Sequence, residues 1–230
     1  MKTIFWDFDG TLAFNENMFS GTLLKVLDDF LPNHNIKKKE LSPYLKSGFP
    51  WHNPEKPHLH LNDPEKWWEE LENIFLNAYV GVDIKNEDAK IYAKYAHEYY
   101  INPSSFQLVD DTYMVLKILR EKGFKNIILS NHVPELPMIV KELGLNNYID
   151  DCITSAKIGY EKPHPEIYKY AIARAKGSKE MWMVGDNIKA DIIGAEKMGI
   201  KGILVHNKET VNNIKYQASG LADVVEIITN

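Results

Sequence analysis

Cysteine, long apolar runs and clusters of one charge are scarce in this sequence of 230 residues, and each scarcity argues against a class of protein. The single cysteine, Cys152, cannot form a disulfide within the chain, and such low usage fits a reducing compartment. No apolar run approaches the ~20 residues that a membrane-spanning helix requires. The start, Met-Lys-Thr, lacks the pattern of a signal peptide. We therefore expect a cytoplasmic protein that does not bind membranes.

Positive charge is also too sparse and too scattered to indicate a nucleic-acid partner. The 32 acidic residues outnumber the 27 lysines and arginines, which gives a formal net charge of −5. Proteins that bind nucleic acids concentrate basic residues in a patch or stripe, and the sequence contains no such run. With 44% hydrophobic and 26% charged residues, the composition is that of a globular protein with a full core.

An apolar stretch at the start of the chain ends in two aspartates. Residues 2–6 predict a buried strand, because short apolar runs followed by turn residues are typical of the interior of a parallel sheet. Side chains alternate along a strand, so Asp7 and Asp9 are expected to point the same way. They would lie at the carboxyl end of the strand, where open α/β sheets bind ligands. Two carboxylates there repel each other unless a cation neutralises them or one holds a proton.

Strand and helix patterns alternate from residue 110 onward. Strands separated by helices of this length imply right-handed crossovers and a mostly parallel sheet. The strands are expected at 126–129, 149–154, 181–184 and 202–205, and the helices at 113–122, 136–143, 165–175 and 188–198.

Residues 14–104 carry helical periodicity and almost no strand signal. Asp63 is expected to cap a helix that has Pro64 at its first position. Segment 32–62, rich in Pro, His, Asn and Lys, is predicted to be one long irregular loop with a short helix near 40–46. We therefore predict a helical cap domain, residues 14–104, inserted into an α/β core formed by residues 1–13 and 105–230.

Polar residues follow several of the predicted strands, and one lysine lies in a connecting loop. Because the carboxyl ends of parallel strands share one edge of the sheet, these groups are expected to converge. Several carboxylates, one lysine and one hydroxyl describe a site for a divalent cation and a phosphate, because Mg²⁺ prefers oxygen ligands and lysine supplies a point charge. The residues are Asp7, Asp9, Ser130, Asn131, Lys162, Asp186 and Asp191.

These segments resemble the four motifs of the haloacid dehalogenase (HAD) superfamily, in order. They are Asp7-Phe8-Asp9-Gly10-Thr11, Ser130-Asn131, Lys162-Pro163, and Gly185-Asp186 with Asp191. The inserted block is similar in place and character to the small helical cap of the family. The resemblance implies a Rossmann-like parallel sheet core with an inserted α-helical cap, and a Mg²⁺-dependent hydrolase of small phosphomonoesters.

The resemblance also implies catalytic roles for individual residues. Asp7 would be the nucleophile that forms an aspartyl-phosphate, and Asp9 would protonate the leaving oxygen and then deprotonate water. Lys162 would hold Asp7 and offset charge on the phosphate. Thr11, Ser130 and Asn131 would bind the phosphoryl group.

The metal ligands that the resemblance implies come from the same motifs. Asp7, the backbone carbonyl of Asp9 and Asp186 would ligate Mg²⁺. Asp191 would complete this shell, and whether it would act directly or through water stays open.

Three alternatives are weighed against the phosphatase. Family members that cleave carbon–halogen bonds lack an acid at the position of Asp9, because halide leaves without a proton, so the sequence favours a phosphatase. A phosphomutase or phosphonate hydrolase needs additional cap groups that the sequence does not reveal. A non-enzymatic phospho-receiver is about half this length and carries its acceptor on a central strand.

The substrate is expected to be a small phosphorylated metabolite of unknown identity. For the loop around residues 51–60, with its three histidines and Trp51, a zinc site, a substrate-facing role and a plain surface position stay open. Monomer and homodimer stay open as well.

Overall fold

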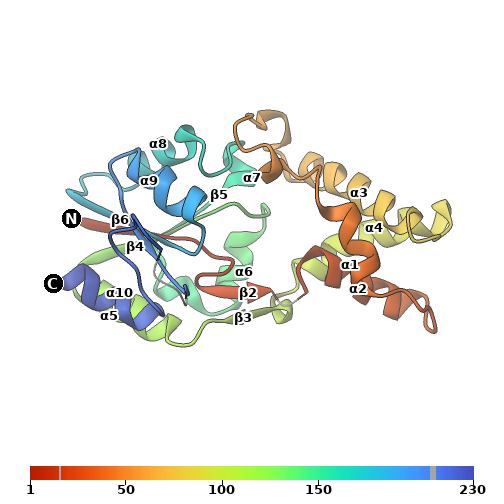
Figure 1. Cartoon of the computed structure of the whole chain (residues 1–230), viewed down its shortest axis with the longest axis horizontal. Coiled ribbons are helices and arrows are strands. Elements are labelled where there is room, and N and C mark those ends of the chain that lie inside the picture. Colours follow the sequence, from red (N-terminus) through yellow and green to blue (C-terminus); the bar gives the residue numbers. More distant parts are fainter. Residues whose placement is uncertain (16, 208–210) are drawn as a thin grey trace.

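The computed structural model describes residues 1–15, 17–207 and 211–230. Its centre is a five-stranded sheet in the order β5-β4-β1-β6-β7, in which each pair of neighbours is parallel (Figure 1). This finding confirms the predicted α/β class with a parallel sheet. The strands are β1 (Lys2–Trp6), β4 (Phe124–Ser130), β5 (Asp151–Thr154), β6 (Glu180–Gly185) and β7 (Lys201–Leu204).

Strand β1 occupies the middle of the sheet because both of its faces are apolar. Ile4 and Trp6 pack into the core on one side, and Phe5 packs into a second cluster on the other. The Trp6 indole donates from Nε1 to Oδ1 of Asn126 on β4, 3.1 Å away. Both partners are fully buried, so this bond adds to the parallel register of β1 and β4.

Helices cover both faces of the sheet. The face of Ile4 and Trp6 is covered by α5 (Thr112–Glu121), α6 (Leu136–Glu142) and α10 (Leu221–Thr229), and the face of Phe5 by α8 (Pro165–Arg174) and α9 (Gly194–Glu196). The helix predicted over 188–198 is instead a π-helical turn, η6 (Ile188–Ile193), followed by α9. A short helix, α7 (Ser155–Ile158), follows β5.

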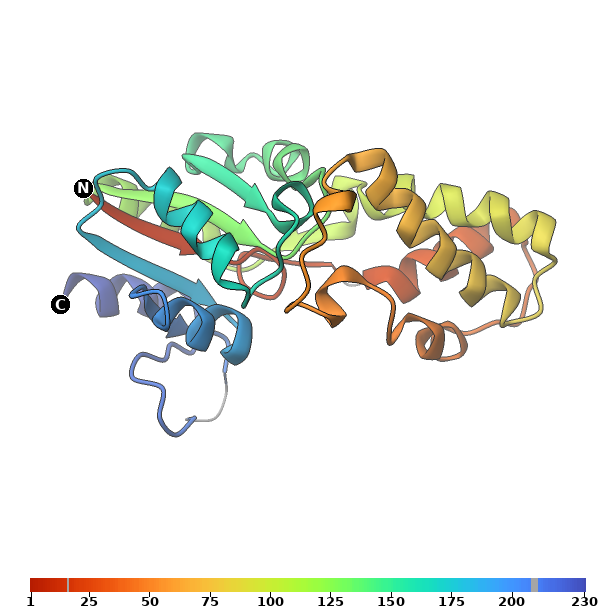
Figure 2. The same ribbon diagram turned by 90° about the horizontal axis from the view of Figure 1, so that it is seen from above.

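The residues between β2 (Ala13–Asn15) and β3 (Phe106–Leu108) form a separate group of helices beyond one end of the sheet (Figures 1 and 2). We call residues 17–105 the helical insert. Its two connections pair with each other as an antiparallel ladder, which the sequence did not reveal because each strand has three residues. The insert contains α1 (Met18–Phe30), α2 (Lys38–Leu41), η1 (Ser42–Leu45), η2 (Pro50–His52), η3 (Leu59–Leu61), α3 (Pro64–Val80), α4 (Asn86–Tyr100) and η4 (Pro103–Ser105).

Local signals in the insert are those that the sequence predicted. The side chain of Asp63 accepts hydrogen bonds from the backbone amides of Glu65 and Lys66, and Pro64 is the first residue of α3. The stripe along α3 that includes Trp67, Trp68 and Phe75 is buried against the rest of the insert. These contacts place the apolar face of α3 inside the bundle.

The insert contacts the sheet part of the molecule through polar groups. Nε1 of Trp68 donates to both carboxylate oxygens of Glu135, at 3.2 and 3.1 Å, and the His97 ring stacks on the same indole. The amide of His58 donates to the carbonyl of Gly159, 2.7 Å away. Two contacts far apart in sequence thus fix the insert beside the carboxyl ends of the strands.

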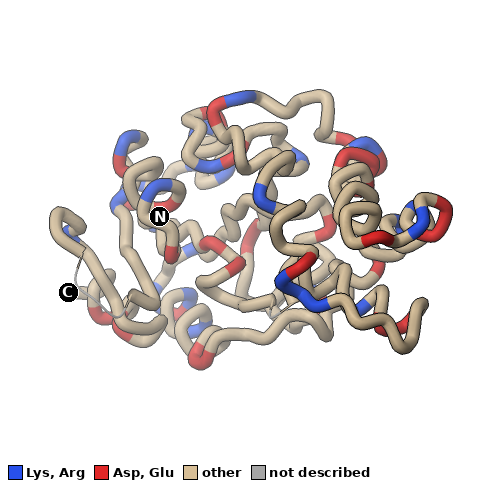
Figure 3. Tube along the Cα trace, turned by 45° about the vertical axis from the view of Figure 1, so that its right-hand side comes forward, with Lys and Arg blue, Asp and Glu red and all other residues tan. Residues whose placement is uncertain are grey.

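Among the described residues, every helix is too short or too polar to cross a membrane. In the view of Figure 3, acidic and basic positions are intermixed over the whole trace.

Candidate active site

The carboxyl ends of β1, β4 and β6 bring most of the predicted site residues together. Asp7 directly follows β1, Ser130 is the last residue of β4, and Asp186 directly follows β6. Lys162 lies in the loop between α7 and α8, and Asp191 lies within η6. Because β1 is flanked by β4 and β6, these residues meet at one point of the sheet edge.

One oxygen of Asp7 holds two partners. Its Oδ1 accepts a hydrogen bond from the Ser130 hydroxyl at 2.7 Å and another from Nζ of Lys162 at 2.9 Å. Asp7 is buried at 8% exposure, and the other two side chains are buried more deeply still. A carboxylate that accepts two bonds at a single oxygen has a fixed orientation.

Lys162 pairs with a second carboxylate. Its Nζ donates to Oδ1 of Asp191 at 2.5 Å, and both side chains are buried. Burial alone would lower the pKa of the Lys162 ammonium, but the charges of Asp191 and Asp7 outweigh it and raise that pKa, so the lysine stays charged. The other oxygen of Asp191 accepts from the amide of Asn187 at 3.0 Å, which fixes this aspartate in place.

The backbone of Lys162 is fixed by Asn131. The side-chain amide of Asn131 donates from Nδ2 to the carbonyl of Lys162 at 2.9 Å, and its Oδ1 accepts from the Lys162 amide at 2.7 Å. The Asn131 side chain therefore orients the lysine, and only its backbone amide remains for an anion.

Three carboxylates form a group that can hold a metal ion. Asp7, Asp186 and Asp191 each offer an oxygen, and these oxygens lie within 4.8 Å of one another. Partial desolvation, followed by the negative charge of Asp7, raises the pKa of Asp186. A hard cation relieves such repulsion, and carboxylates are its preferred ligands. The donor set therefore fits Mg²⁺, whereas the carboxylate of Asp9 lies outside this group.

Two glycines leave room for the carboxylates of this group. Gly10 has a φ of +78°, and a β-carbon at this position would lie 2.5 Å from Oδ2 of Asp186. A β-carbon on Gly185 would overlap the carboxylate of Asp191. Any other residue at either position would push an acidic side chain out of the group.

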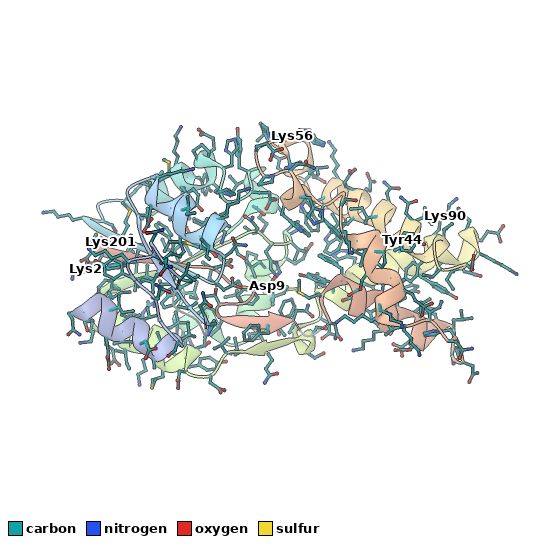
Figure 4. All side chains as sticks on the ribbon, viewed as in Figure 1. Lys2, Asp9, Tyr44, Lys56, Lys90 and Lys201 are labelled. Carbon is teal, nitrogen blue, oxygen red and sulfur yellow. The ribbon has the colours of Figure 1, made fainter. Side chains whose placement is uncertain are left out.

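Asp9 lies beside a histidine that sequence reasoning missed. Nε2 of His132 is 3.3 Å from Oδ2 of Asp9, and neither ring nitrogen of this buried histidine has a hydrogen-bond partner among the described residues. Burial, followed by the charge of Asp9, raises the pKa of the Tyr100 hydroxyl, which comes from the insert. His132 directly follows Ser130-Asn131, and that adjacency was the one available signal. Figure 4 shows Asp9 where the sheet part of the molecule faces the helical insert.

Thr11 lies in the turn after Asp9 and is fully buried. Its hydroxyl has no hydrogen-bond partner in the described part of the chain, and its carbonyl is hydrogen-bonded to the ring of His206, 3.0 Å away. The turn is therefore anchored from the C-terminal part of the chain.

A cavity of about 740 Å³ opens above these residues. Asp9, Asn131 and Lys162 line it from the sheet side, and Trp51 and His52 line it from the loop whose role the sequence left open. Among the described residues, the one group of three or more metal-ligating side chains that lie close together is the aspartate group, and the histidines of that loop are outside it. Part of the loop faces the cavity.

Comparison with known proteins places this architecture in a family. The sequence model of the haloacid dehalogenase-like hydrolases matches residues 1–199. Haloacid dehalogenase-like hydrolase domain-containing protein 3 of Mus musculus is 27% identical over 150 residues, which are 64% of this chain and 59% of the mouse protein. The match thus spans less than two thirds of that relative.

Solved structures cover nearly the whole chain. A HAD phosphatase from Thermococcus onnurineus has 25% identity and a TM-score of 0.67, with 100% of this chain and 98% of that chain covered. A HAD-hydrolase of Bacillus subtilis bound to magnesium has 18% identity and a TM-score of 0.77, with 100% and 99% covered, and this likeness concerns the fold. The fold predicted from the four motifs is confirmed, and the chain belongs to the haloacid dehalogenase-like hydrolase family.

Proposed function

We propose that this chain is a magnesium-dependent hydrolase of small phosphomonoesters that works through an aspartyl-phosphate intermediate. The observation that carries the proposal is the anchoring of Asp7, whose Oδ1 accepts bonds from Ser130 and Lys162. A nucleophile held in one orientation attacks with little loss of entropy. The phosphatase name of the Thermococcus relative supports the reaction class, and the magnesium in the Bacillus relative supports the metal.

In the first step, an oxygen of Asp7 attacks the phosphorus atom and the bond from phosphorus to the ester oxygen breaks. Asp9, in its protonated form, gives its proton to that leaving oxygen. The Lys162 ammonium offsets the negative charge that gathers on Asp7 and on the transferred group. Phosphoryl transfer needs mainly positioning and charge neutralisation, and a buried ammonium between two carboxylates supports both.

In the second step, the Asp9 carboxylate takes a proton from water, whose oxygen attacks phosphorus. The bond from phosphorus to Asp7 breaks, and inorganic phosphate leaves. The hydroxyl of Thr11 and the backbone amide of Asn131 hold the phosphoryl oxygens during both steps. The Ser130 hydroxyl, whose single proton bonds Asp7 before the reaction, turns to the phosphoryl group once Asp7 carries it.

Asp7 and Asp186, with the backbone carbonyl of Asp9, are the proposed holders of the ion. Asp191 acts by positioning, because its two oxygens are already bonded to Lys162 and to the amide of Asn187. When bound, a divalent ion neutralises charge on these carboxylates and on the phosphoryl group. The proposed location, from the single free cysteine Cys152, is cytoplasmic.

The test is a panel of small phosphorylated metabolites, assayed for released phosphate with magnesium present and then chelated. We expect release that depends on magnesium, no turnover by the Asp7→Asn variant, and a rate ~10²–10⁴ lower for Asp9→Asn, the usual worth of an acid–base group. Full activity of Asp7→Asn would contradict the covalent role. Stable phosphorylation by a small phosphodonor without phosphate release would instead indicate a phospho-receiver.

A further inference from the structure

The cavity above the candidate active site has one wall of aromatic rings. Phe19, Phe49, Trp51 and Tyr100 line it from the helical insert, and Asp9 and Lys162 line it from the sheet side. The reacting end of a substrate and the aromatic wall therefore share a single space of about 740 Å³, large enough for a ligand of nucleotide size.

The rings of this wall lie nearly parallel to one another. Phe19 and Tyr100 stack with centroids 4.3 Å apart and planes 8° apart, and Phe49 and Trp51 stack at 4.6 Å and 12°. Phe19 links the two pairs, at 5.0 Å and 23° from Phe49. Phe19, Phe49 and Tyr100 are buried and cover one another's faces, so Trp51, the half-buried ring at the end of this stack, is the one that can receive a further ring.

The aromatic wall begins beside Asp9, the residue proposed to protonate the leaving oxygen. The Tyr100 ring lies with its centroid 6.1 Å from that of His132, whose Nε2 is 3.3 Å from Oδ2 of Asp9, and Tyr100 and Asp9 both line the cavity. A leaving group that takes a proton from Asp9 is therefore directed along the rings. Trp51 is the half-buried member of the four, and its ring is accessible from the cavity.

Polar side chains lie at the outer part of the same cavity. Ser20, Ser42 and His52 come from the insert, and Lys189 comes from η6. These side chains offer both hydrogen-bond donors and hydrogen-bond acceptors to a ligand that lies beside the aromatic wall. Polar substituents on a bound ring can therefore pair with these groups, and a ring without them leaves the groups in contact with water.

We propose that the substrate is a phosphomonoester whose alcohol carries a planar aromatic ring, and that this ring stacks on Trp51. This inference rests on the proposed phosphatase function and adds the substrate class to it. Two chemical sources fit, namely a simple arylmethyl phosphate and a nucleoside 5′-monophosphate, whose base lies one sugar away from the ester.

The experiment compares esters that differ in the ring alone. Benzyl phosphate is paired with cyclohexylmethyl phosphate, and nucleoside 5′-monophosphates are paired with ribose 5-phosphate. We expect kcat/KM to favour the aromatic member of at least one pair by about 5- to 100-fold, the range that stacking of one base on aromatic side chains supports. The pair that shows the preference identifies the source.

Variants of the wall separate stacking from packing. Trp51→Leu keeps apolar bulk and should reduce the aromatic preference several-fold, while Trp51→Phe, which keeps a ring, should retain most of it. The matched control is Tyr95→Leu, because Tyr95 is an aromatic residue of the same insert that packs on Phe30, away from the cavity. Tyr95→Leu should leave the preference unchanged. If Trp51→Leu fails to fold, the two ester pairs assayed with the parent chain and the calorimetry described below carry the test.

Failure of this inference is distinguishable from failure of the proposed function. Phosphate released equally from both members of both pairs would overturn the aromatic substrate class and leave the phosphatase intact. An absence of phosphate release from every ester would overturn the phosphatase. Calorimetric binding of a nucleoside 5′-monophosphate but not of ribose 5-phosphate to Asp7→Asn would still support the stacking surface, whereas equal binding of the two would count against it.

Discussion

Lys162→Met is the perturbation that the structure makes most informative. Lys162 is buried between Asp7, 2.9 Å away, and Asp191, 2.5 Å away. Methionine keeps the length and apolar stem of the side chain but leaves two buried carboxylates without a counter-charge. Removal of one partner from a buried ion pair costs about 3–5 kcal/mol of unfolding free energy. We expect a loss in this range at pH 8.

The matched control is Lys169→Met. Lys169 forms an equally short pair with Glu166, at 2.6 Å, but both side chains are exposed on α8. Exposed pairs contribute about 0–1 kcal/mol because water screens them. The same substitution in two pairs of similar length thus isolates the effect of burial, and urea unfolding of both variants measures it.

The pH dependence of the Lys162→Met loss provides a second check. Burial raises the pKa of Asp191, and the charge of Lys162 opposes that rise, so the pKa of Asp191 in the folded variant lies further above its value in the unfolded chain. The contribution of Asp191 is then favourable at low pH and is lost as pH rises through the folded value. The loss should therefore be smaller at pH 5 than at pH 8, and Asp191→Asn in the same chain should restore part of it. An equal loss for Lys162→Met and Lys169→Met would refute this reasoning.

Three further predictions concern groups outside the lysine pair. Burial would raise the pKa of Glu135, but hydrogen bonds from His97 and Trp68 lower it overall, so its contribution is fully present above pH 4.5 and is lost as pH falls through the lowered value. Glu135→Gln should therefore cost roughly 1 kcal/mol of unfolding free energy at pH 7 and progressively less as pH falls below 4.5, measured by urea unfolding. Burial raises the pKa of Glu161 from 4.5 to about 7, so this residue makes folding less favourable as pH rises from the first value to the second. Glu161→Gln should therefore raise the free energy of unfolding by up to roughly 3 kcal/mol at pH 8 and leave it unchanged at pH 4, which thermal melts at several pH values measure. The buried side-chain amide of Asn126 forms hydrogen bonds with three groups, one of which is the Trp6 indole. Asn126→Leu leaves these groups without a partner and should lower the free energy of unfolding by about 2–4 kcal/mol, measured by urea unfolding. A change under about 0.5 kcal/mol would show that these hydrogen bonds do not stabilise the fold.

The fold was predictable where a local pattern determines it. The apolar run of β1, the strand and helix periodicities after residue 110 and the Asp63 cap each lie within a few neighbouring residues. The structure contains these elements, except that η6 and α9 replace the helix predicted over 188–198. The β2–β3 ladder was not predictable, because its two strands have three residues each and pair across about 90 positions. The π-helical turn η6 was predicted as an α-helix because its six residues are too few to show a repeat different from that of an α-helix.

The convergence of the candidate site followed from topology. Once β1 is the central strand of a parallel sheet, the residues that follow β1, β4 and β6 have to lie at one edge, so Asp7, Ser130 and Asp186 are neighbours. His132 was missed because its relation to Asp9 depends on the path of the chain after β4, which no spacing encodes. The bond from Trp68 to Glu135 joins residues 67 positions apart and likewise has no local signal.

The charged residues of this site lie at the edge of the sheet and outside its apolar central strand. A buried lysine between two aspartates is poor evidence for stability, because well-packed apolar residues of the same volume are commonly as stable or more stable. The adjacent strand β1 supplies the apolar burial with Ile4, Phe5 and Trp6, all fully buried. The carboxylates begin at Asp7, directly after the last residue of the strand. The central strand of the sheet is therefore apolar, and the charged residues lie at the edge of the sheet. Stability alone does not explain these charges, whereas a reaction on an anionic group does.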